Sequence, residues 1–418
     1  MSPLSLLPLL IISVGGYLLI KLRFFYVMHP IRTLKFTFGG QNVKESIISL
    51  MLALAGTLGV GNIVGVAYGI YVGGAGSVFW LSVSALFSSA IKYSEVFLSS
   101  KHNTGYGIIS VIDKNIKPTA LSKAYAALAL ILSFAMGSIM QAQAICGSAS
   151  AFGRSSAVIV SVVFVFVALV CLLGKNRIKK AVAFVIPAAT LLYTGMCLSV
   201  IFHEAENLLT VALEILSSAF DFSALRGGIG AFILSSGIKE GFARGLLSNE
   251  AGAGTSSFSH TSHAPEAPNT HDASYPMRAG IYGILEVIFD TLVLCPLTAF
   301  VILLSRREGV FHGSIFEISE IFTSYIGNSA PFLLLITVSA FAVSTTLCWY
   351  YYGRVALDYL THGRHLSIFS ALFIISFAVG LLFKIDILIH INDIILFLLT
   401  LITLYTLIKN RASLAKPE

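Results

Sequence analysis

Charged residues are scarce in this sequence: Asp, Glu, Lys and Arg make up 11% of its 418 residues, whereas hydrophobic residues make up 56%. So little charge, with a mean hydropathy of +0.87, excludes a soluble globular protein. The composition predicts an all-α polytopic membrane protein. No soluble domain is expected.

Cysteine patterns that would indicate a disulfide framework or a metal centre are also missing. The five cysteines lie within or at the ends of apolar segments, at positions Cys146, Cys171, Cys197, Cys295 and Cys348. We expect them to be small buried apolar fillers.

Histidines are absent from the middle of the apolar segments, and all ten lie in loops or at expected helix ends. An enzyme site inside the membrane would place ionisable groups within the spans. Three histidines, His260, His263 and His271, lie with an Asp and a Glu in residues 259–272. Because their spacing matches no zinc motif, we expect a solvated cytoplasmic loop, with a metal or hydrolase site as the less favoured alternative.

Long apolar segments make up most of the sequence. A membrane-spanning helix needs about 20 apolar residues, and eleven segments qualify: 3–22, 46–70, 76–98, 122–148, 155–173, 178–200, 226–247, 278–304, 329–353, 366–384 and 388–409. The first segment lacks a basic region before it and a small-residue cleavage site after it. We therefore expect a retained span and not a signal peptide.

The net charge of +7 is explained by orientation in the membrane and does not indicate a nucleic-acid partner. With an external N-terminus and a cytoplasmic C-terminus, 22 of the 27 Lys and Arg residues fall on the cytoplasmic side. This agrees with the positive-inside rule. The predicted location is the cell membrane, plasma or inner.

Omitting the first helix leaves two sets of five helices, and an odd number per set forces them into opposite orientations. The predicted organisation is an extra N-terminal helix and basic loop (1–45), a first repeat (46–200), an external loop (201–225), a second inverted repeat (226–409) and a cytoplasmic tail (410–418).

Each set opens with a glycine-rich helix. The first contains Gly56, Gly59, Gly61 and Gly65; the second contains glycines at 227, 228, 230, 237, 241 and 245, before Ser248-Asn-Glu-Ala-Gly-Ala-Gly254. Interrupted helices at corresponding positions of two halves are typical of transporters, which bind solutes at the break. The alternative is that the glycines only permit close helix packing.

Five separated motifs occur in order along the chain: Ala55-Gly-Thr-Leu-Gly-Val-Gly-Asn-Ile-Val-Gly-Val-Ala67 with Gly73-Gly-Ala-Gly-Ser-Val-Phe-Trp80, Lys92-Tyr-Ser-Glu-Val96, Ala243-Arg-Gly-Leu-Leu-Ser-Asn-Glu-Ala-Gly-Ala-Gly254, Phe289-Asp-Thr-Leu-Val-Leu-Cys295 and Ser344-Thr-Thr-Leu-Cys-Trp-Tyr-Tyr-Tyr-Gly353. Together they are highly specific. From about residue 20 to 409 the chain resembles the sodium:alanine/glycine symporters, the alanine-or-glycine:cation symporter family, with a leucine-transporter-like fold. It departs from the family pattern at Ala75, at Ser138 and from Ala253 onward, and Ser138 is expected to alter substrate preference.

The resemblance implies a small neutral amino acid as substrate. Free amides at a broken helix suit its carboxylate, and free carbonyls suit its ammonium group or Na⁺. Thr57, Gly59 and Gly61 are therefore expected to contact the substrate, chiefly through the backbone. Gly59-Val-Gly-Asn62 matches the pattern of the wider leucine-transporter fold, which implies a sodium site formed by Ala55, Leu58, Ala342, Thr345 and Thr346.

Four further residues are candidates for the substrate pocket. Trp349 would cap the pocket and keep it small, and its alternative role is an anchor at the membrane interface. Gln141 would offer its amide to the substrate or bond to another helix. Phe242 and Leu246, one turn apart, would line the pocket. The hydroxyls of Thr345 and Thr346 have the alternative of bonding to their own helix.

Other polar residues are expected to be structural. Lys92 and Glu95 have the spacing of an ion pair within one helix. Ser248-Asn-Glu-Ala-Gly252 is predicted to end a helix and to act as an inner gate or turn-locking element. Asp290 is expected to make structural hydrogen bonds.

Secondary active transport is therefore the predicted function, because a channel would show repeated pore motifs, which are not found. We expect Na⁺-coupled symport of alanine or glycine, with D-alanine and serine as further candidates, by alternating access. A proton-coupled amino acid permease of the same fold is the alternative. Na⁺ would be co-transported, with no organic cofactor; the partners are the substrate and the lipid bilayer. The oligomeric state stays open, with a monomer as one case.

Overall fold

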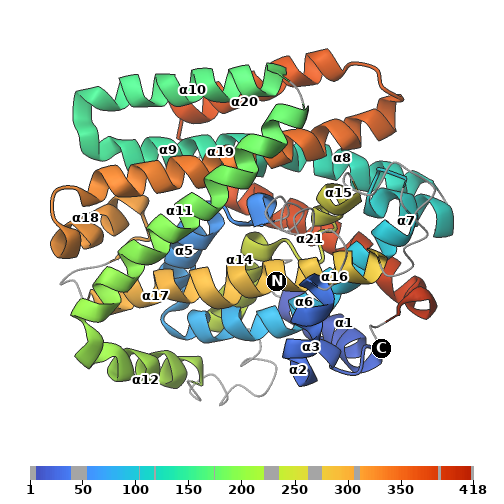
Figure 1. Ribbon diagram of the computed structural model, residues 1–418, viewed down its shortest axis with the longest axis horizontal. Coiled ribbons are helices and arrows are strands. Elements are labelled where there is room, and N and C mark those ends of the chain that lie inside the picture. Colours follow the sequence, from blue (N-terminus) through green and yellow to red (C-terminus); the bar gives the residue numbers. More distant parts are fainter. Residues whose placement is uncertain are drawn as a thin grey trace.

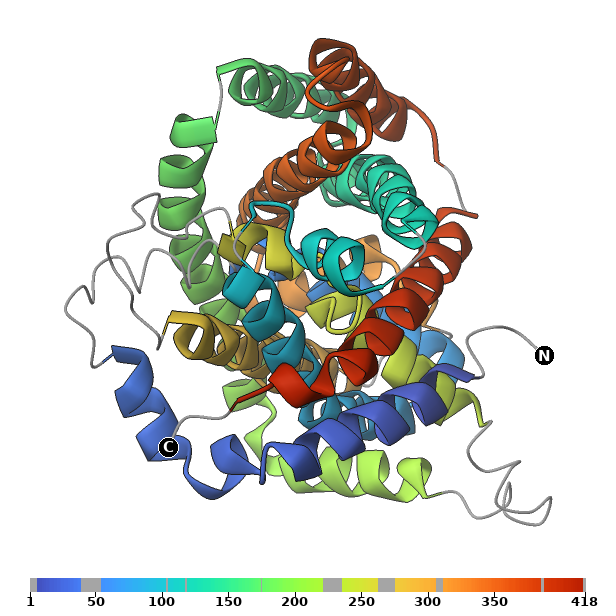
Figure 2. The same cartoon turned by 90° about the vertical axis from the view of Figure 1, so that its right-hand side faces the viewer.

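The structure is a computed structural model that describes residues 6–38, 54–102, 104–116, 119–173, 175–220, 235–261, 275–305, 311–384 and 387–415 (Figures 1 and 2). Within these ranges the regular structure is helical throughout, without a strand. The predicted all-α class is confirmed.

The N-terminal half of the chain contains these helices: α1 (Leu7–Lys21), α2 (Phe25–Met28), α3 (Pro30–Phe38), η2 (Gly61–Gly65), α5 (Val66–Gly73), α6 (Gly76–His102), α7 (Ile108–Asn115), α8 (Ala120–Phe134), η3 (Ala135–Ile139), α9 (Met140–Ala149), η4 (Ser150–Ser155), α10 (Ser156–Leu173), α11 (Lys175–His203), η5 (Ala205–Asn207) and α12 (Leu208–Ala219). The segments η2 and η3 are π-helical. Such local widening of a helix is frequent at functional sites.

The C-terminal half contains α14 (Ser236–Asn249), α15 (Ser256–Thr261), α16 (Tyr275–Val287), η7 (Ile288–Leu294), α17 (Cys295–Leu304), α18 (Ile315–Ile326), α19 (Ala330–Thr361), α20 (Leu366–Leu382), α21 (Leu388–Lys409) and η8 (Arg411–Ser413). η7 is π-helical and joins α16 to α17 without a break.

Helices from the two halves of the sequence pack in pairs. α6 packs against α14 and α16, whereas α8 and α9 pack against α19 and α20. Figure 1 shows α8, α9, α10, α19 and α20 gathered at the top of the view and α1, α6, α14 and α16 lower down, with α11 slanting between them. The chain therefore forms two helix groups, and each group contains helices from both halves of the sequence. The inverted repeat itself stays a prediction.

Five helical stretches among the described residues are long and apolar enough to cross a bilayer: Ala120–Gly153, Val185–His203, Tyr275–Leu304, Ala330–Thr361 and Leu388–Lys409. Shorter apolar helices accompany them at Leu7–Lys21, Gly61–Gly73, Ser156–Leu172 and Leu366–Leu382. Exposed Val158, Val162, Leu372 and Ile375 give α10 and α20 apolar outer surfaces, which suit contact with lipid. The chain is a multi-pass membrane protein, and the count of eleven spans stays a prediction.

The glycines of α14 serve helix packing and do not interrupt this helix. A Cβ atom at Gly241 would lie 2.6 Å from Trp80 Cβ, and one at Gly237 would lie 3.2 Å from the Gly73 carbonyl oxygen. A Cβ atom at Gly245 would collide with the Ser84 hydroxyl. The expectation that these glycines break the second helix is wrong at 237, 241 and 245; residues 227, 228 and 230 lie outside the described residues.

Gly241→Ala should therefore destabilise the protein, because its methyl group would push α14 away from α6. Overpacking of this kind costs about 1–3 kcal/mol. The matched control is Gly195→Ala in α11, where a Cβ atom would meet nothing within 4 Å. Thermal unfolding in detergent should show a lower midpoint for Gly241→Ala alone. Equal midpoints for both variants would contradict the packing role.

Candidate functional site

The first of the two helix breaks lies where the glycine-rich run predicts it. The chain is helical at 54–57, leaves the helix at 58–60 and resumes in η2 at Gly61. The Leu58 amide donates to the Leu54 carbonyl at 2.6 Å. The Gly59 amide instead donates to the Asn62 side-chain oxygen at 3.2 Å, so a side chain replaces the helical partner.

The second break lies at residues 250–255, later than predicted. α14 ends at Asn249, and α15 begins at Ser256. Between them Glu250, Gly252 and Gly254 have φ values of 54°, 87° and 81°. This left-handed backbone is cheap for glycine and unusual for Glu250. The prediction that Ser248-Asn-Glu-Ala-Gly252 ends a helix is confirmed.

The two breaks lie side by side, and Asp290 joins their edges. A Cβ atom at Gly61 would lie 3.6 Å from the Leu247 carbonyl oxygen. Asn62 Nδ2 donates to Asp290 Oδ1 at 2.5 Å, and Ser248 Oγ donates to Asp290 Oδ2 at 2.5 Å. Asp290, carried by π-helical η7, is fully buried. The expected structural hydrogen bonds of Asp290 therefore fasten both broken helices.

Two buried hydroxyls lie beside the first break. A Cβ atom at Gly59 would lie 2.7 Å from Thr345 Oγ1 of α19. Thr345 Oγ1 and Thr346 Oγ1 have no hydrogen-bond partner among the described residues. By contrast, Thr337 on the same helix donates to its own Leu333 carbonyl at 2.8 Å. The alternative that Thr345 and Thr346 bond to their own helix is therefore wrong.

The other predicted sodium ligands are buried with these hydroxyls. Ala55 precedes the first break, Leu58 is its first residue, and Ala342 lies one turn before Thr345 and Thr346 on α19. Buried oxygen atoms without donors are expensive unless a ligand satisfies them. Oxygen donors are also the ligands that hard cations prefer. The residues present therefore fit a cation of the Na⁺ type.

Trp349 is buried against the second break and is not a membrane-interface anchor. Its side chain is fully buried, and its indole nitrogen donates to Glu250 Oε1 at 3.1 Å. Its Cβ atom packs so close to Gly137 of η3 that no side chain would fit there. Glu250 also accepts a hydrogen bond from Thr255 at 2.6 Å. The break thereby fixes the orientation of the indole ring.

Among the described residues, no hydrogen bond joins the remaining pocket candidates Thr57, Gln141, Phe242 and Leu246 to one another. Thr57 bonds to its own helix at Leu54, 3.4 Å away. Gln141 Nε2 donates to the Met136 carbonyl at 3.1 Å, and Gln141 Oε1 is buried without a partner among the described residues. Phe242 and Leu246 are both buried on α14.

Ser138 does not point into this site. Its hydroxyl donates to the Phe373 carbonyl of α20 at 3.2 Å and accepts from Ser376 at 2.7 Å. These contacts hold η3 against α20. The expectation that Ser138 alters substrate preference therefore has no direct contact to support it.

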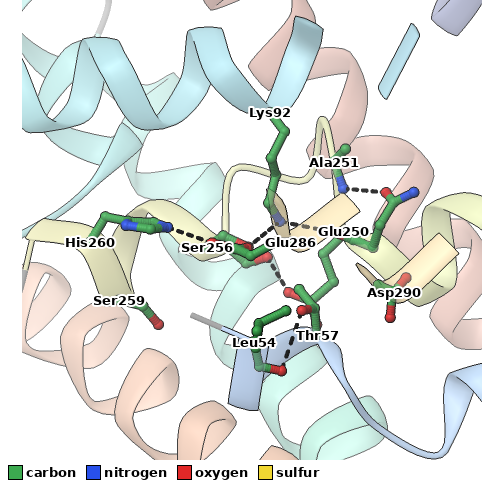
Figure 3. Close-up of polar contacts among 12 residues, drawn as sticks. Leu54, Thr57, Lys92, Glu250, Ala251, Ser256, Ser259, His260, Glu286 and Asp290 are labelled. Carbon is green, nitrogen blue, oxygen red and sulfur yellow. Dashed lines mark hydrogen bonds and ion pairs between the residues drawn. The ribbon is translucent and has the colours of Figure 1, made fainter. Parts of the chain in front are cut away.

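The second break is held by two charged residues of α6, Lys92 and Glu95. The sequence spacing alone predicts that these two residues pair with each other. Glu95 Oε2 accepts from the amides of Gly252 at 2.9 Å and Gly254 at 3.2 Å. Lys92 Nζ donates to the Asn249 carbonyl at 2.7 Å and also to the Ser256 hydroxyl (Figure 3). Lys92 and Glu95 thus hold neighbouring parts of the same turn.

The ion partner of Lys92 is Glu286 of α16, at 3.4 Å between Nζ and Oε2. The expected Lys92–Glu95 ion pair is therefore wrong. His260 Nε2 lies 2.6 Å from the other oxygen of Glu286 (Figure 3). Because His260 is only 4% exposed, its expected place in a solvated loop is also wrong; residues 262–274 lie outside the described residues.

Two interrupted helices facing each other within a multi-pass helical protein define a membrane transporter. Residues 2–414 match the sodium:alanine symporter family, and the chain belongs to this family. It is a transporter and not an enzyme.

Several relatives, whose names state an ion and a solute, match most of the chain. The sodium/alanine symporter AgcS of Methanococcus maripaludis is 30% identical, over 88% of this chain and 83% of its own length. The sodium/proton-dependent alanine carrier protein of Bacillus sp. strain PS3 is 28% identical, over 77% and 74%. A Bacillus subtilis protein named "Probable sodium/glutamine symporter GlnT" is 28% identical, over 87% and 76%.

Asp290→Asn should weaken the connection between the two breaks, because it replaces a charged acceptor with an amide. Hydrogen bonds to charged groups contribute about 1.5–3 kcal/mol each. The control is Asp358→Asn, at a partly exposed aspartate that accepts from Tyr106 at 2.9 Å. Thermal unfolding in detergent should show a clear loss for Asp290→Asn and a smaller one for Asp358→Asn. The reverse order would contradict the bridging role of Asp290.

Proposed function

We propose that this protein carries a small neutral amino acid, alanine or glycine, into the cell together with Na⁺. The observation that carries the proposal is the pair of buried hydroxyls of Thr345 and Thr346, which have no hydrogen-bond partner in the part of the chain that the structure describes, with Thr345 lying against the bare backbone of Gly59. In this proposal Na⁺ binds those hydroxyls with the carbonyls of Ala55, Leu58 and Ala342.

The amino acid binds beside this cation at the first break. Its carboxylate meets the backbone at Gly61, where the half-helix begins and attracts negative charge, while Gly59, whose amide is held by Asn62, offers a bare surface without a side chain. Trp349 closes the side-chain end, with Gln141, Phe242, Leu246 and Thr57 as further pocket residues. A rigid, buried indole leaves little room, which favours alanine and glycine over larger side chains.

Transport then follows alternating access, with the N-terminus outside and the C-terminus in the cytoplasm. Proton-coupled uptake is the second candidate. The observation that favours it is the buried His260–Glu286 contact, because buried Asp, Glu and His side chains form the proton relays of transporters. The relative named a sodium/proton-dependent alanine carrier also keeps this alternative open.

Imposed ion gradients test the function directly. The full chain in proteoliposomes should accumulate labelled alanine when only a Na⁺ gradient is present, and a protonophore should leave this uptake intact. Competition with unlabelled glycine, D-alanine, serine and glutamine should rank the small solutes first. Uptake driven by a proton gradient alone would overturn sodium coupling, and strongest competition by glutamine would overturn the small pocket.

Thr346→Ala should raise the Na⁺ concentration for half-maximal uptake by about tenfold, because one cation ligand is lost. Uptake at saturating Na⁺ should change less. The matched control is Thr337→Ala, which removes a buried hydroxyl that bonds to its own helix on α19. An unchanged Na⁺ dependence of Thr346→Ala would remove this residue from the site.

A further inference from the structure

Glu286 has an unusual environment for a carboxylate. It is fully buried, and within the described residues its side chain makes one hydrogen bond, of 2.6 Å between Oε1 and His260 Nε2. Its other oxygen, Oε2, lies 3.4 Å from Lys92 Nζ without hydrogen-bond geometry. Lys92 directs its hydrogen bonds to Asn249 and Ser256 instead. Glu286 therefore depends on His260 for its hydrogen bond.

A protonated imidazole would satisfy Glu286 better than a neutral one. Hydrogen bonds between two charged groups are shorter and stronger than neutral ones, and the 2.6 Å between His260 Nε2 and Glu286 Oε1 is short for a nitrogen–oxygen hydrogen bond. The elements beside α15 carry titratable side chains of both signs: Lys92, Glu95 and Lys101 of α6, Tyr275, Arg278, Tyr282 and Glu286 of α16, Tyr352, Arg354 and Asp358 of α19, and Glu250 of the turn. An added proton on His260 would give Glu286 a charged hydrogen-bond donor beside the ammonium group of Lys92.

The contact between His260 and Glu286 also connects two helices, α15 and α16. His260 lies on α15, the short helix that continues the second broken helix beyond its break, and Glu286 lies on α16. Figure 3 shows His260 reaching Glu286 from one side while Lys92 descends to it from α6. The Tyr275 hydroxyl donates to the His260 carbonyl at 3.0 Å, so α16 holds both ends of this residue. Any motion of α15 away from α16 must separate His260 from Glu286.

We propose that His260 and Glu286, beside Lys92, form a proton-binding site that fastens α15 to α16. Binding of one proton, taken from the aqueous phase onto the imidazole, stabilises the arrangement in which α15 is docked. Loss of this proton weakens the contact and favours release of α15. The site does not depend on which solute is carried, and it adds a proton-sensitive step to the movement of the second broken helix.

Hydrogen exchange of the full chain in detergent tests this site without any substrate. The peptide covering residues 250–261 is followed at about pH 5.5 and about pH 8 and corrected for intrinsic exchange rates. A charged hydrogen bond predicts about tenfold slower exchange at the lower pH. A peptide from α21 serves as an internal reference and should keep the same corrected rate at both values.

Two variants assign the effect to the contact. His260→Gln keeps a polar side chain that cannot gain a proton, and it should lose the pH difference; Glu286→Gln should lose it as well. The matched control is His312→Gln, because His312 forms an exposed contact of 3.3 Å with Glu317. This control should retain the wild-type difference.

Three results would overturn the proposal: equal corrected rates at both pH values in the wild type, an unchanged difference in His260→Gln, or loss of the difference in His312→Gln. Because no transported solute is present, failure of the alanine uptake assay leaves this test unaffected. A pH-independent α15 in a protein that still carries alanine with Na⁺ would overturn the proton site alone.

Discussion

The structure depends on one constraint, which is that a backbone amide or carbonyl inside a membrane protein must find a partner. Two of its helices are interrupted within the packed interior, so the amides lose their ordinary helical partners from Gly59 in the first break and from Ala251 in the second. Side chains supply the missing partners. Asn62 caps the Gly59 amide, and Glu95 accepts from Gly252 and Gly254. The long helix α6 meets this requirement at the second break through its buried Lys92 and Glu95.

The two breaks differ in how many side chains bond to them, and this difference indicates different roles. At the second break, Glu95, Lys92 and Tyr125 all bond to the turn; the Tyr125 hydroxyl donates to the Ala253 carbonyl at 2.5 Å. At the first break, the neighbouring oxygen atoms of Thr345 and Thr346 have no partner among the described residues. A turn bonded by three side chains suits a joint that keeps its shape, whereas hydroxyl oxygen atoms beside bare backbone suit a site that receives a solute.

The sequence predicts the parts of this arrangement that follow from composition and local pattern. The apolar runs predict the helical class, and four glycines within ten residues predict the first break. The second break was misplaced because the glycines of α14 have the same spacing as packing glycines, and only the position of α6 distinguishes the two roles. The partners of Lys92 and His260 could not be predicted, since Glu286 is distant from Lys92 in sequence. Lys92 and Glu286 could be singled out from the sequence only because ionisable residues within membrane spans usually have a functional or structural role.

A transporter must also change shape, which restricts where its strong contacts can lie. Asp290 binds Asn62 and Ser248 through two 2.5 Å contacts, so the edges of the two breaks should move as one unit. The contact of Lys92 with Glu286 is longer, at 3.4 Å, and lacks hydrogen-bond geometry. This pair joins α6 to α16, which pack closely against each other, and leaving its two buried charges apart would be costly. The short helix α15 is held to α16 by the 2.6 Å contact of His260 with Glu286 and by the Tyr275 hydroxyl. In the proposed cycle, release of these two contacts would free α15 while Asp290 keeps the two breaks together.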